Sequence, residues 1–275
     1  MQVEWTIRPP HETGENRGFY LNRLLKIVCM SVILTLVNSV LVMTQLVSAF
    51  PIPERLEFDV SYTGITAGRV VQEVTATGGE VHIVSTAHSA DWLKLFFPVD
   101  DRIESVLISG TPPLSIGVPK LYKEQIREGR TRYHKEAVFD CEKMNVNTCD
   151  FLNKSNTTHK ITKQTYDTLS SFFFFRSIPL QVGKSYFIEI FDCKKLWNTE
   201  VQVVRREQIE TPLGIFNTVL IKPIMKFEGI FARTGDMFIW LTDDERRIPV
   251  QMKSKVKIGN ITATLVGGSY WPNGK

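Results

Sequence analysis

The feature that most constrains the fold is a two-residue alternation of apolar and polar side chains, which runs through the chain from Phe50 onward. Successive residues of a β-strand point to opposite faces, so a segment such as Leu56-Glu57-Phe58-Asp59-Val60-Ser61-Tyr62 predicts a half-buried strand. About a dozen segments of this kind follow one another, separated by glycine- and proline-containing turns rather than by helices. The pattern predicts a mostly β fold, an antiparallel barrel-like or sandwich sheet, in one domain over residues 50–275.

One segment departs from the alternation. Residues 165–176 have a polar start followed by a leucine and four consecutive phenylalanines, Phe172 to Phe175. This composition predicts a short helix that is capped near Thr165, ends before Pro179 and packs across an open end of the sheet. Because each phenyl ring can bury 150–250 Å², we interpret the aromatic run mainly as core.

The N-terminus predicts export. Four basic residues lie among the first 26, and the stretch from Ile27 to Pro53 has no charged residue. Its end, Val47-Ser48-Ala49, has the small or β-branched residues that precede a signal-peptidase site, which predicts a signal peptide over residues 1–49 and cleavage between Ala49 and Phe50. The alternative is an uncleaved inner-membrane anchor, since residues 27–47 are long enough to span about 30 Å of hydrocarbon.

Two of the four cysteines have mirrored surroundings, Phe139-Asp140-Cys141 and Cys149-Asp150-Phe151. If residues 142–148 form a hairpin loop, antiparallel pairing places Cys141 opposite Cys149. In an oxidising compartment this predicts a Cys141–Cys149 disulfide. We interpret Cys193 as a buried small hydrophobe rather than as a reactive thiol.

No motif for catalysis, metal binding or cofactor binding occurs. The chain lacks the glycine-rich nucleotide loops, the paired-histidine zinc motif and the nucleophile elbow of serine hydrolases. The net charge of +4 is spread along the chain, which argues against a nucleic-acid partner. The sequence therefore names no catalytic residue, no metal ligand and no cofactor, and it favours a protein that is not an enzyme.

Several segments resemble domain-of-unknown-function family 3108. They include Asp167-Thr168-Leu169-Ser170-Ser171 with Arg176, Glu210-Thr211-Pro212-Leu213-Gly214, and Ile239-Trp240-Leu241-Thr242-Asp243-Asp244. The opening segment from Glu54 to Tyr62 is similar to the first block of that family, so the resemblance covers about residues 54–270. It implies an uncharacterised bacterial protein of the Gram-negative envelope, with a mostly β fold and no functional residue to carry over.

The leading functional hypothesis is a non-enzymatic exported envelope protein whose curved sheet binds a lipid, another apolar ligand or a partner protein. Low-ranked candidates for an apolar lining are Trp92, Phe96, Phe97, Phe172 and Phe175, which fill a dry core equally well. One alternative is an envelope hydrolase acting on cell-wall or polysaccharide material. Another is a structural assembly factor that pairs through a sheet edge.

The first prediction concerns processing. We expect protein from the native envelope to begin at Phe50, because the basic, apolar and small-residue regions of the N-terminus follow the order of a secretory signal. Intact-mass measurement checks this. A species that retains residues 1–49 would identify the segment as an anchor.

Overall fold

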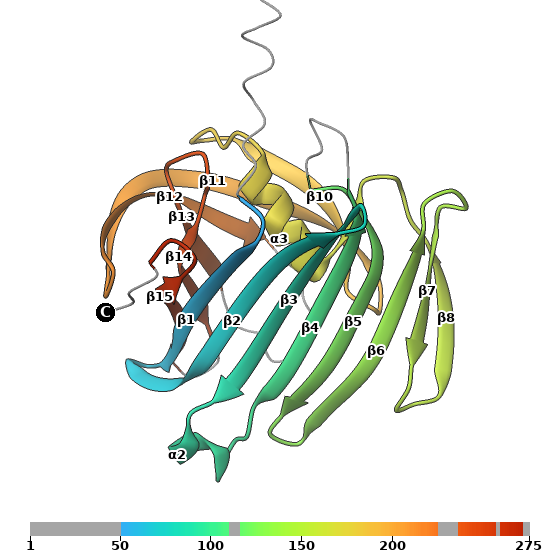
Figure 1. Ribbon diagram of the computed structural model, residues 1–275, viewed down its shortest axis with the longest axis horizontal. Coiled ribbons are helices and arrows are strands. Elements are labelled where there is room, and N and C mark those ends of the chain that lie inside the picture. The colour runs from blue at the N-terminus through green and yellow to red at the C-terminus, as the bar shows by residue number, and fades with distance from the viewer. Residues whose placement is uncertain (1–50, 110–115, 225–235, 257–258, 272–275) are drawn as a thin grey trace, which may run out of the picture. The chain divides into compact units, whose positions relative to one another are not determined.

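The alternating segments form strands of one continuous, strongly curved sheet (Figure 1). The computed structural model describes residues 51–109, 116–224, 236–256 and 259–271, so the predicted signal segment and the Ala49–Phe50 cleavage site lie outside the described residues. The described strands are β1 (Glu54–Tyr62), β2 (Ile65–Thr77), β3 (Glu80–Ser89), β4 (Asp100–Ile108), β5 (Val118–Glu128), β6 (Thr131–Asp140), β7 (Asn145–Asp150), β8 (Ser155–Lys160), β9 (Thr165–Asp167), β10 (Ser185–Phe191), β11 (Leu196–Thr211), β12 (Gly214–Ile224), β13 (Met237–Thr242), β14 (Pro249–Lys255) and β15 (Asn260–Gly268).

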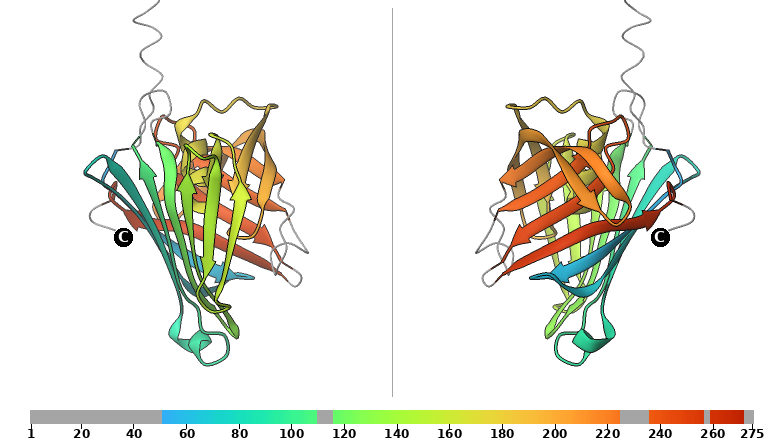
Figure 2. Two further views of the ribbon diagram at one scale, coloured as in Figure 1. Left: turned by 90° about the vertical axis from the view of Figure 1, so that its right-hand side faces the viewer. Right: turned by 90° about the vertical axis from the view of Figure 1, so that its left-hand side faces the viewer.

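Strand β1 lies in the middle of the sheet, with β2 on one side and β15 on the other. Its order is β8-β7-β6-β5-β4-β3-β2-β1-β15-β14-β13-β12-β11-β10-β9, and every neighbouring pair is antiparallel except β9 and β10. The chain passes from β8 at one edge to β9 at the other through residues 161–164, a step that can span at most about 17 Å. The curvature therefore brings the two edges near each other, as the two walls of Figure 2 show.

The predicted mostly β fold is confirmed, with two differences. The sheet has fifteen strands rather than about a dozen, and it is not closed, because β8 and β9 are its two ends. Two of the additional strands, β8 and β9, lack the alternation on which the prediction depends. All six residues of β8 are polar, and β9 is only three residues long.

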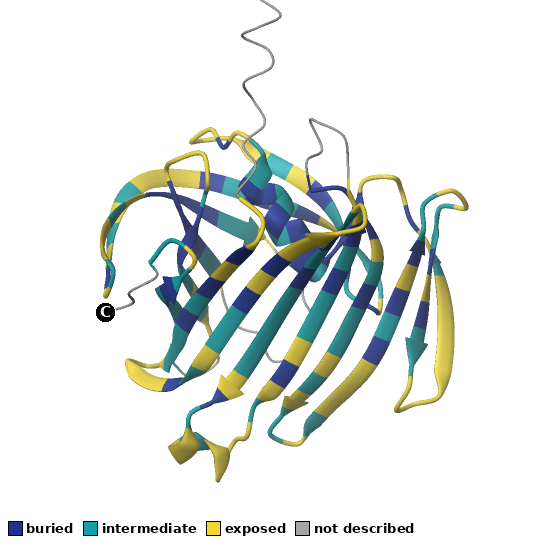
Figure 3. Ribbon diagram, in the orientation of Figure 1, coloured by how far each residue is buried: buried dark blue, intermediate teal, exposed yellow. Residues whose placement is uncertain are grey.

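The concave side of the sheet is filled by side chains and by a helix, α3 (Thr168–Ser177). The larger apolar cluster joins residues of both halves, including Ile83, Leu107 and Tyr122 from one half and Phe191 and Ile221 from the other. Buried and exposed positions alternate along the strands in Figure 3. A second cluster, around Leu56, Phe58, Leu220 and Trp240, packs β1 against the C-terminal strands.

Helix α3 is the predicted helix, and it begins later than expected. Thr165 belongs to β9, and the N-cap is Asp167, whose carboxylate accepts hydrogen bonds from the backbone N–H groups of Leu169 and Ser170. The same carboxylate accepts a 2.6 Å bond from the Ser105 hydroxyl on β4. Asp167 is fully buried, so one side chain starts the helix and fixes it to the opposite wall.

The other helix is α2 (Asp91–Lys94), a single turn between β3 and β4. Neither this turn nor α3 has the length and hydropathy needed to cross a bilayer, and the described part of the chain contains no other helix.

A buried ion pair fixes the C-terminal end of α3. Arg176 and Glu54 are almost completely buried and form two parallel hydrogen bonds, Nη1 to Oε2 at 2.6 Å and Nη2 to Oε1 at 2.7 Å. The guanidinium also donates to the backbone carbonyls of Arg246 and Arg247, and the Tyr270 hydroxyl donates to Glu54 at 2.7 Å. Bidentate geometry and additional partners are what a buried ion pair needs to offset its desolvation.

The cysteine-bearing hairpin has a different register from the predicted one. Its turn is residues 141–144, Asp140 pairs with Asn145, and Cys149 lies opposite Glu136. Cys141 is five residues beyond Glu136, about 16 Å along an extended chain. The described cysteines are all free, so the predicted Cys141–Cys149 disulfide is wrong.

Core burial explains this register. Phe139 lies opposite Val146 and Ala137 opposite Thr148, and all four side chains are buried. The predicted loop of residues 142–148 would remove Val146 from the sheet. A disulfide closing so short a loop contributes only about 2–3 kcal/mol, and burying a large apolar side chain contributes a comparable about 1.5–3 kcal/mol, without an oxidation step.

The second prediction tests the ion pair. We expect Glu54→Gln to lower the free energy of unfolding by about 3–5 kcal/mol, because it leaves the Arg176 guanidinium buried without its counter-charge. The matched control is Glu57→Gln, which removes a surface ion pair with Arg55 and should cost at most about 1 kcal/mol. Urea unfolding measures both, and equal losses would contradict the assignment. Adding Arg176→Met to Glu54→Gln should recover part of the loss.

Candidate functional site

Four large apolar side chains are exposed together on the loop that joins β3 to β4. We call Trp92, Leu95, Phe96 and Phe97 the apolar tip; their exposed fractions are 49%, 86%, 81% and 42%. The loop carries α2 and projects beyond the strands at one end of the sheet (Figure 1). Soluble proteins rarely expose contiguous apolar side chains unless the surface contacts a partner or a membrane.

Hydrogen bonds hold this loop in place from two sides. The Trp92 indole N–H donates to the Thr66 carbonyl at 2.9 Å, and the Ala90 N–H donates to the Ala67 carbonyl at 2.7 Å. Within the loop, the Phe97 N–H donates to the Leu93 carbonyl at 2.7 Å. The exposed side chains are therefore presented on a defined backbone.

The β5–β6 turn packs directly beside the apolar tip. Gly129 has a positive φ of 54°, and a Cβ at this position would lie 2.6 Å from the Phe97 ring. The Gly129 N–H also donates to the Pro98 carbonyl at 2.8 Å. Only glycine allows this approach, which places the exposed residues Arg127, Arg130 and Arg132 next to the tip.

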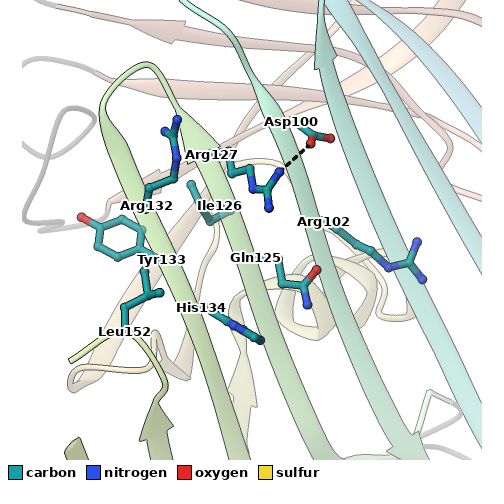
Figure 4. Close-up of a pocket in the computed structure, with 9 residues that line it drawn as sticks. All are labelled: Asp100, Arg102, Gln125, Ile126, Arg127, Arg132, Tyr133, His134 and Leu152. Carbon is teal, nitrogen blue, oxygen red and sulfur yellow. Dashed lines mark ion pairs between the residues drawn. The ribbon is translucent and has the colours of Figure 1, made fainter. Parts of the chain in front are cut away.

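The same hairpin forms a hollow of about 570 Å³ on the outer face of β4, β5 and β6 (Figure 4). We call it the basic hollow. Arg102, Gln125 and His134 are cross-strand partners and form one row, and Arg127 and Arg132 form a second row nearer the turn. The remaining lining residues are Asp100, Ile126, Tyr133 and Leu152.

Positive charge predominates in the basic hollow. It contains three arginines and one carboxylate, Asp100, whose oxygen lies 3.6 Å from the Arg127 guanidinium. Arg102 forms an ion pair with Glu104 beside the hollow, so Arg132 supplies the excess positive charge. Arg132 donates to the backbone carbonyls of Gly129 and Thr131, so its charge is not neutralised by these contacts. Such an arrangement suits an anion, because guanidinium groups bind carboxylate and phosphate oxygens with matching geometry.

A pair of acidic side chains lies at the base of the apolar tip, on β4 and β5. Asp101 is buried and accepts a 2.7 Å hydrogen bond from the Arg127 N–H. Burial raises the pKa of Asp101, and burial together with the neighbouring Asp101 raises the pKa of Glu128 to about 7. The two carboxyl groups are hydrogen-bonded to each other, and burial favours the protonated form of both.

A second acidic group is half-buried on the inner face of the sheet. Glu124 accepts a 3.0 Å hydrogen bond from the Tyr122 hydroxyl and pairs across the strands with Lys135. Burial raises the pKa of Glu124 to about 7. Burial also raises the pKa of the nearby Cys193 thiol well above its usual range, so this cysteine is a protonated core residue.

The structure places the five predicted lining residues in two separate groups. Trp92, Phe96 and Phe97 belong to the apolar tip, whereas Phe175 is buried in the larger core cluster and Phe172 is packed against it. Helices α2 and α3 lie at opposite ends of the molecule (Figure 1). The five residues therefore do not line one cavity mouth.

The basic hollow was not predicted from the sequence. Its residues come from β4, β5, β6 and the β7–β8 turn, and each looks like an ordinary outward-facing residue of a strand. The available signal was the concentration of arginines in Arg127, Arg130 and Arg132. No cluster of three or more potential metal ligands occurs within the described ranges.

The family model of a protein of unknown function, DUF3108, matches residues 57–266. The chain belongs to the DUF3108 family. This membership confirms the resemblance that the sequence segments indicated. Among curated proteins, none matches this DUF3108 chain.

Two solved structures resemble this DUF3108 protein. One is a beta-barrel-like protein of domain of unknown function DUF1849 from Brucella abortus, with a TM-score of 0.50 and 14% identity over 81% of this chain and 97% of that chain. The other, from Bacteroides fragilis, is labelled "putative exported protein with YmcC-like fold" and has a TM-score of 0.30 and 11% identity over 79% and 95%. The first supports a β-barrel-like fold, and a score of 0.30 does not establish a shared fold.

The third prediction concerns the pH dependence of stability. The folded state raises the pKa of Glu124 from 4.5 to about 7, so it holds this proton more tightly than the unfolded chain does. The resulting stabilisation is complete below pH 4.5 and is lost as the pH rises through about 7. We expect the free energy of unfolding to decrease between pH 5.5 and pH 8. The decrease should be smaller in Glu124→Gln than in the unaltered protein, and the difference should be of the order of 2 kcal/mol.

The matched control is Glu136→Gln, which removes the same charge from the outer face of the neighbouring strand, where Glu136 pairs with Lys123. This variant should keep the pH dependence of the unaltered protein. Urea titrations at the two pH values measure the effect. An unchanged pH dependence in Glu124→Gln would show that this carboxyl does not cause it.

Proposed function

We propose that this DUF3108 protein is a non-enzymatic, exported protein of the cell envelope that docks on a lipid membrane surface through the apolar tip. The observation that carries the proposal is the exposure of Leu95 and Phe96, which are 86% and 81% exposed on a loop that projects from the sheet. The order of charge and hydropathy at the N-terminus supports export, and the aromatic and leucine side chains support insertion into the lipid interface.

The hydrophobic effect and electrostatic attraction both contribute to the proposed membrane docking. Transfer of an exposed leucine or phenylalanine from water contributes about 1.5–3 kcal/mol at most for each side chain. Each arginine near an anionic lipid surface contributes about 1 kcal/mol. With Leu95 and Phe96 inserting and Arg127, Arg130 and Arg132 beside them, both contributions are needed for firm but reversible attachment.

The neighbouring charges favour a membrane over a protein partner. Three arginines border the tip, and burial raises the pKa of both Asp101 and Glu128 beneath it, which reduces their negative charge. The ion pair between Asp91 and Lys94 is neutral as a unit. The tip is thus an apolar surface with a cationic border, which complements an anionic lipid interface.

The fourth prediction uses Trp92 as an intrinsic probe. With the full chain bound to vesicles that contain lipids brominated in their acyl chains, we expect quenching of Trp92 fluorescence. The signal is isolated by subtracting the Trp92→Phe variant, because other tryptophans also fluoresce. This readout reports insertion of the tip even if residues 27–47 attach the chain to the vesicle.

The double variant Leu95→Ser with Phe96→Ser should abolish the quenching of Trp92. Its control is Phe187→Ser with Ile215→Ser, two side chains that are 67% and 68% exposed on other strands, and this control should leave the quenching intact. A Trp92 signal that is indifferent to brominated lipid would overturn membrane docking and favour a protein partner for the tip.

A further inference from the structure

We infer that the basic hollow binds the phosphate group of an anionic lipid headgroup, a proposal that rests on the proposed membrane docking and assigns it a lipid class. The hollow and the apolar tip are parts of one structure, joined by the contact between Gly129 and the Phe97 ring. A bilayer that receives the tip therefore presents its headgroups to the adjacent hollow.

The position of the two rows supports a headgroup rather than an acyl chain. Arg127 and Arg132 form the row next to the turn, and Gln125 and His134 lie two residues farther along the strands, about 7 Å away. The headgroup region of a leaflet is roughly 5–8 Å thick. The two rows therefore span about the thickness of the headgroup region.

The side chains are suited to a phosphate. Arg127 and Arg132 are opposite each other across the hairpin. Their guanidinium groups point apart in Figure 4, Arg127 toward Asp100, and rotation of these exposed side chains brings both within reach of one phosphate. Asp100 lies 3.6 Å from Arg127 and restricts that side chain without neutralising the whole hollow. Gln125 supplies an amide donor in the next row, which can satisfy a further phosphate oxygen.

The size and rim of the hollow also favour a lipid. A volume of about 570 Å³ is sufficient for a phosphate with its glycerol. Leu152 and Tyr133 at the rim are 53% and 38% exposed, and they offer apolar contacts to the glycerol backbone. The acyl chains would remain in the bilayer beside the apolar tip.

The fifth prediction compares vesicles of phosphatidylcholine alone with vesicles that also contain one third phosphatidylglycerol, a ratio of about 2:1 chosen to give a negative surface. Using the Trp92 signal of the full chain, we expect tighter binding to the anionic vesicles. Arg127→Gln with Arg132→Gln should weaken that binding about tenfold or more and leave binding to phosphatidylcholine unchanged. The matched control, Arg205→Gln with Arg206→Gln, removes two exposed arginines of β11 and should have little effect.

Substitution of Arg132 could disturb the β5–β6 turn, because this side chain donates to two backbone carbonyls there. A second variant therefore tests the hollow without changing the turn. Gln125→Glu adds a negative charge to the hollow from the middle of β5 and should also remove the preference for phosphatidylglycerol. Thermal midpoints of all variants verify folding. A folded Gln125→Glu protein that keeps the full preference contradicts the headgroup site.

The outcomes separate the two proposals. Trp92 quenching that is equal on both vesicles, and unaffected by the arginine substitutions, overturns the headgroup site and leaves membrane docking standing. No quenching on either vesicle overturns docking and, with it, a lipid ligand. In that case, binding of sn-glycerol 3-phosphate that is lost in Arg127→Gln with Arg132→Gln would assign the hollow to a soluble phosphate instead.

Discussion

The ion pair between Arg176 and Glu54 is the interaction on which the arrangement of the two sheet halves depends. It links the end of α3 to the first residue of β1, and through Tyr270 it reaches the end of the chain. The start of the same helix is fixed to β4 by Asp167 and Ser105. Because α3 is held at both ends, it can fill the concave side of a sheet that no hydrogen bonds close between β8 and β9.

The sequence predicted most of the strands that face the core, but it missed β8, which has only polar residues, and β9, which is buried but only three residues long. Segments such as residues 56–62 and 185–191 can be recognised as strands because one face is buried, so apolar and polar side chains alternate along them. Strand β8 has only polar residues, so nothing in its sequence distinguishes it from a loop. The four phenylalanines of α3 also follow this reasoning, since four consecutive residues point to nearly all sides of a helical turn and large apolar side chains there are buried by enclosing the helix.

The register of the cysteine-bearing hairpin and the candidate site were not predicted from the sequence for a different reason. Mirrored flanks around Cys141 and Cys149 are a local pattern, whereas the register is set by which side chains face the shared core. Likewise, residues 92–97 read as core because apolar side chains are usually buried. Their position between two strands, bounded by Asp91 and Pro98, indicates a loop, but only the neighbouring elements decide whether a loop is covered. The basic hollow combines residues of separate strands and has no signature along the chain.

One consequence of the strand order concerns how such a molecule folds. Strand β1 pairs with β2 immediately, yet its other neighbour is β15, more than 200 residues later. Glu54 has no counter-charge until α3 has been made, and the second core cluster needs the last strand. All other neighbouring strands of the described sheet are consecutive in the sequence, so they can pair early, whereas the β1–β15 pairing must close a long loop whose entropy is lost before its contacts compensate for it. The two halves of the sheet can therefore form separately before the β1–β15 pairing joins them.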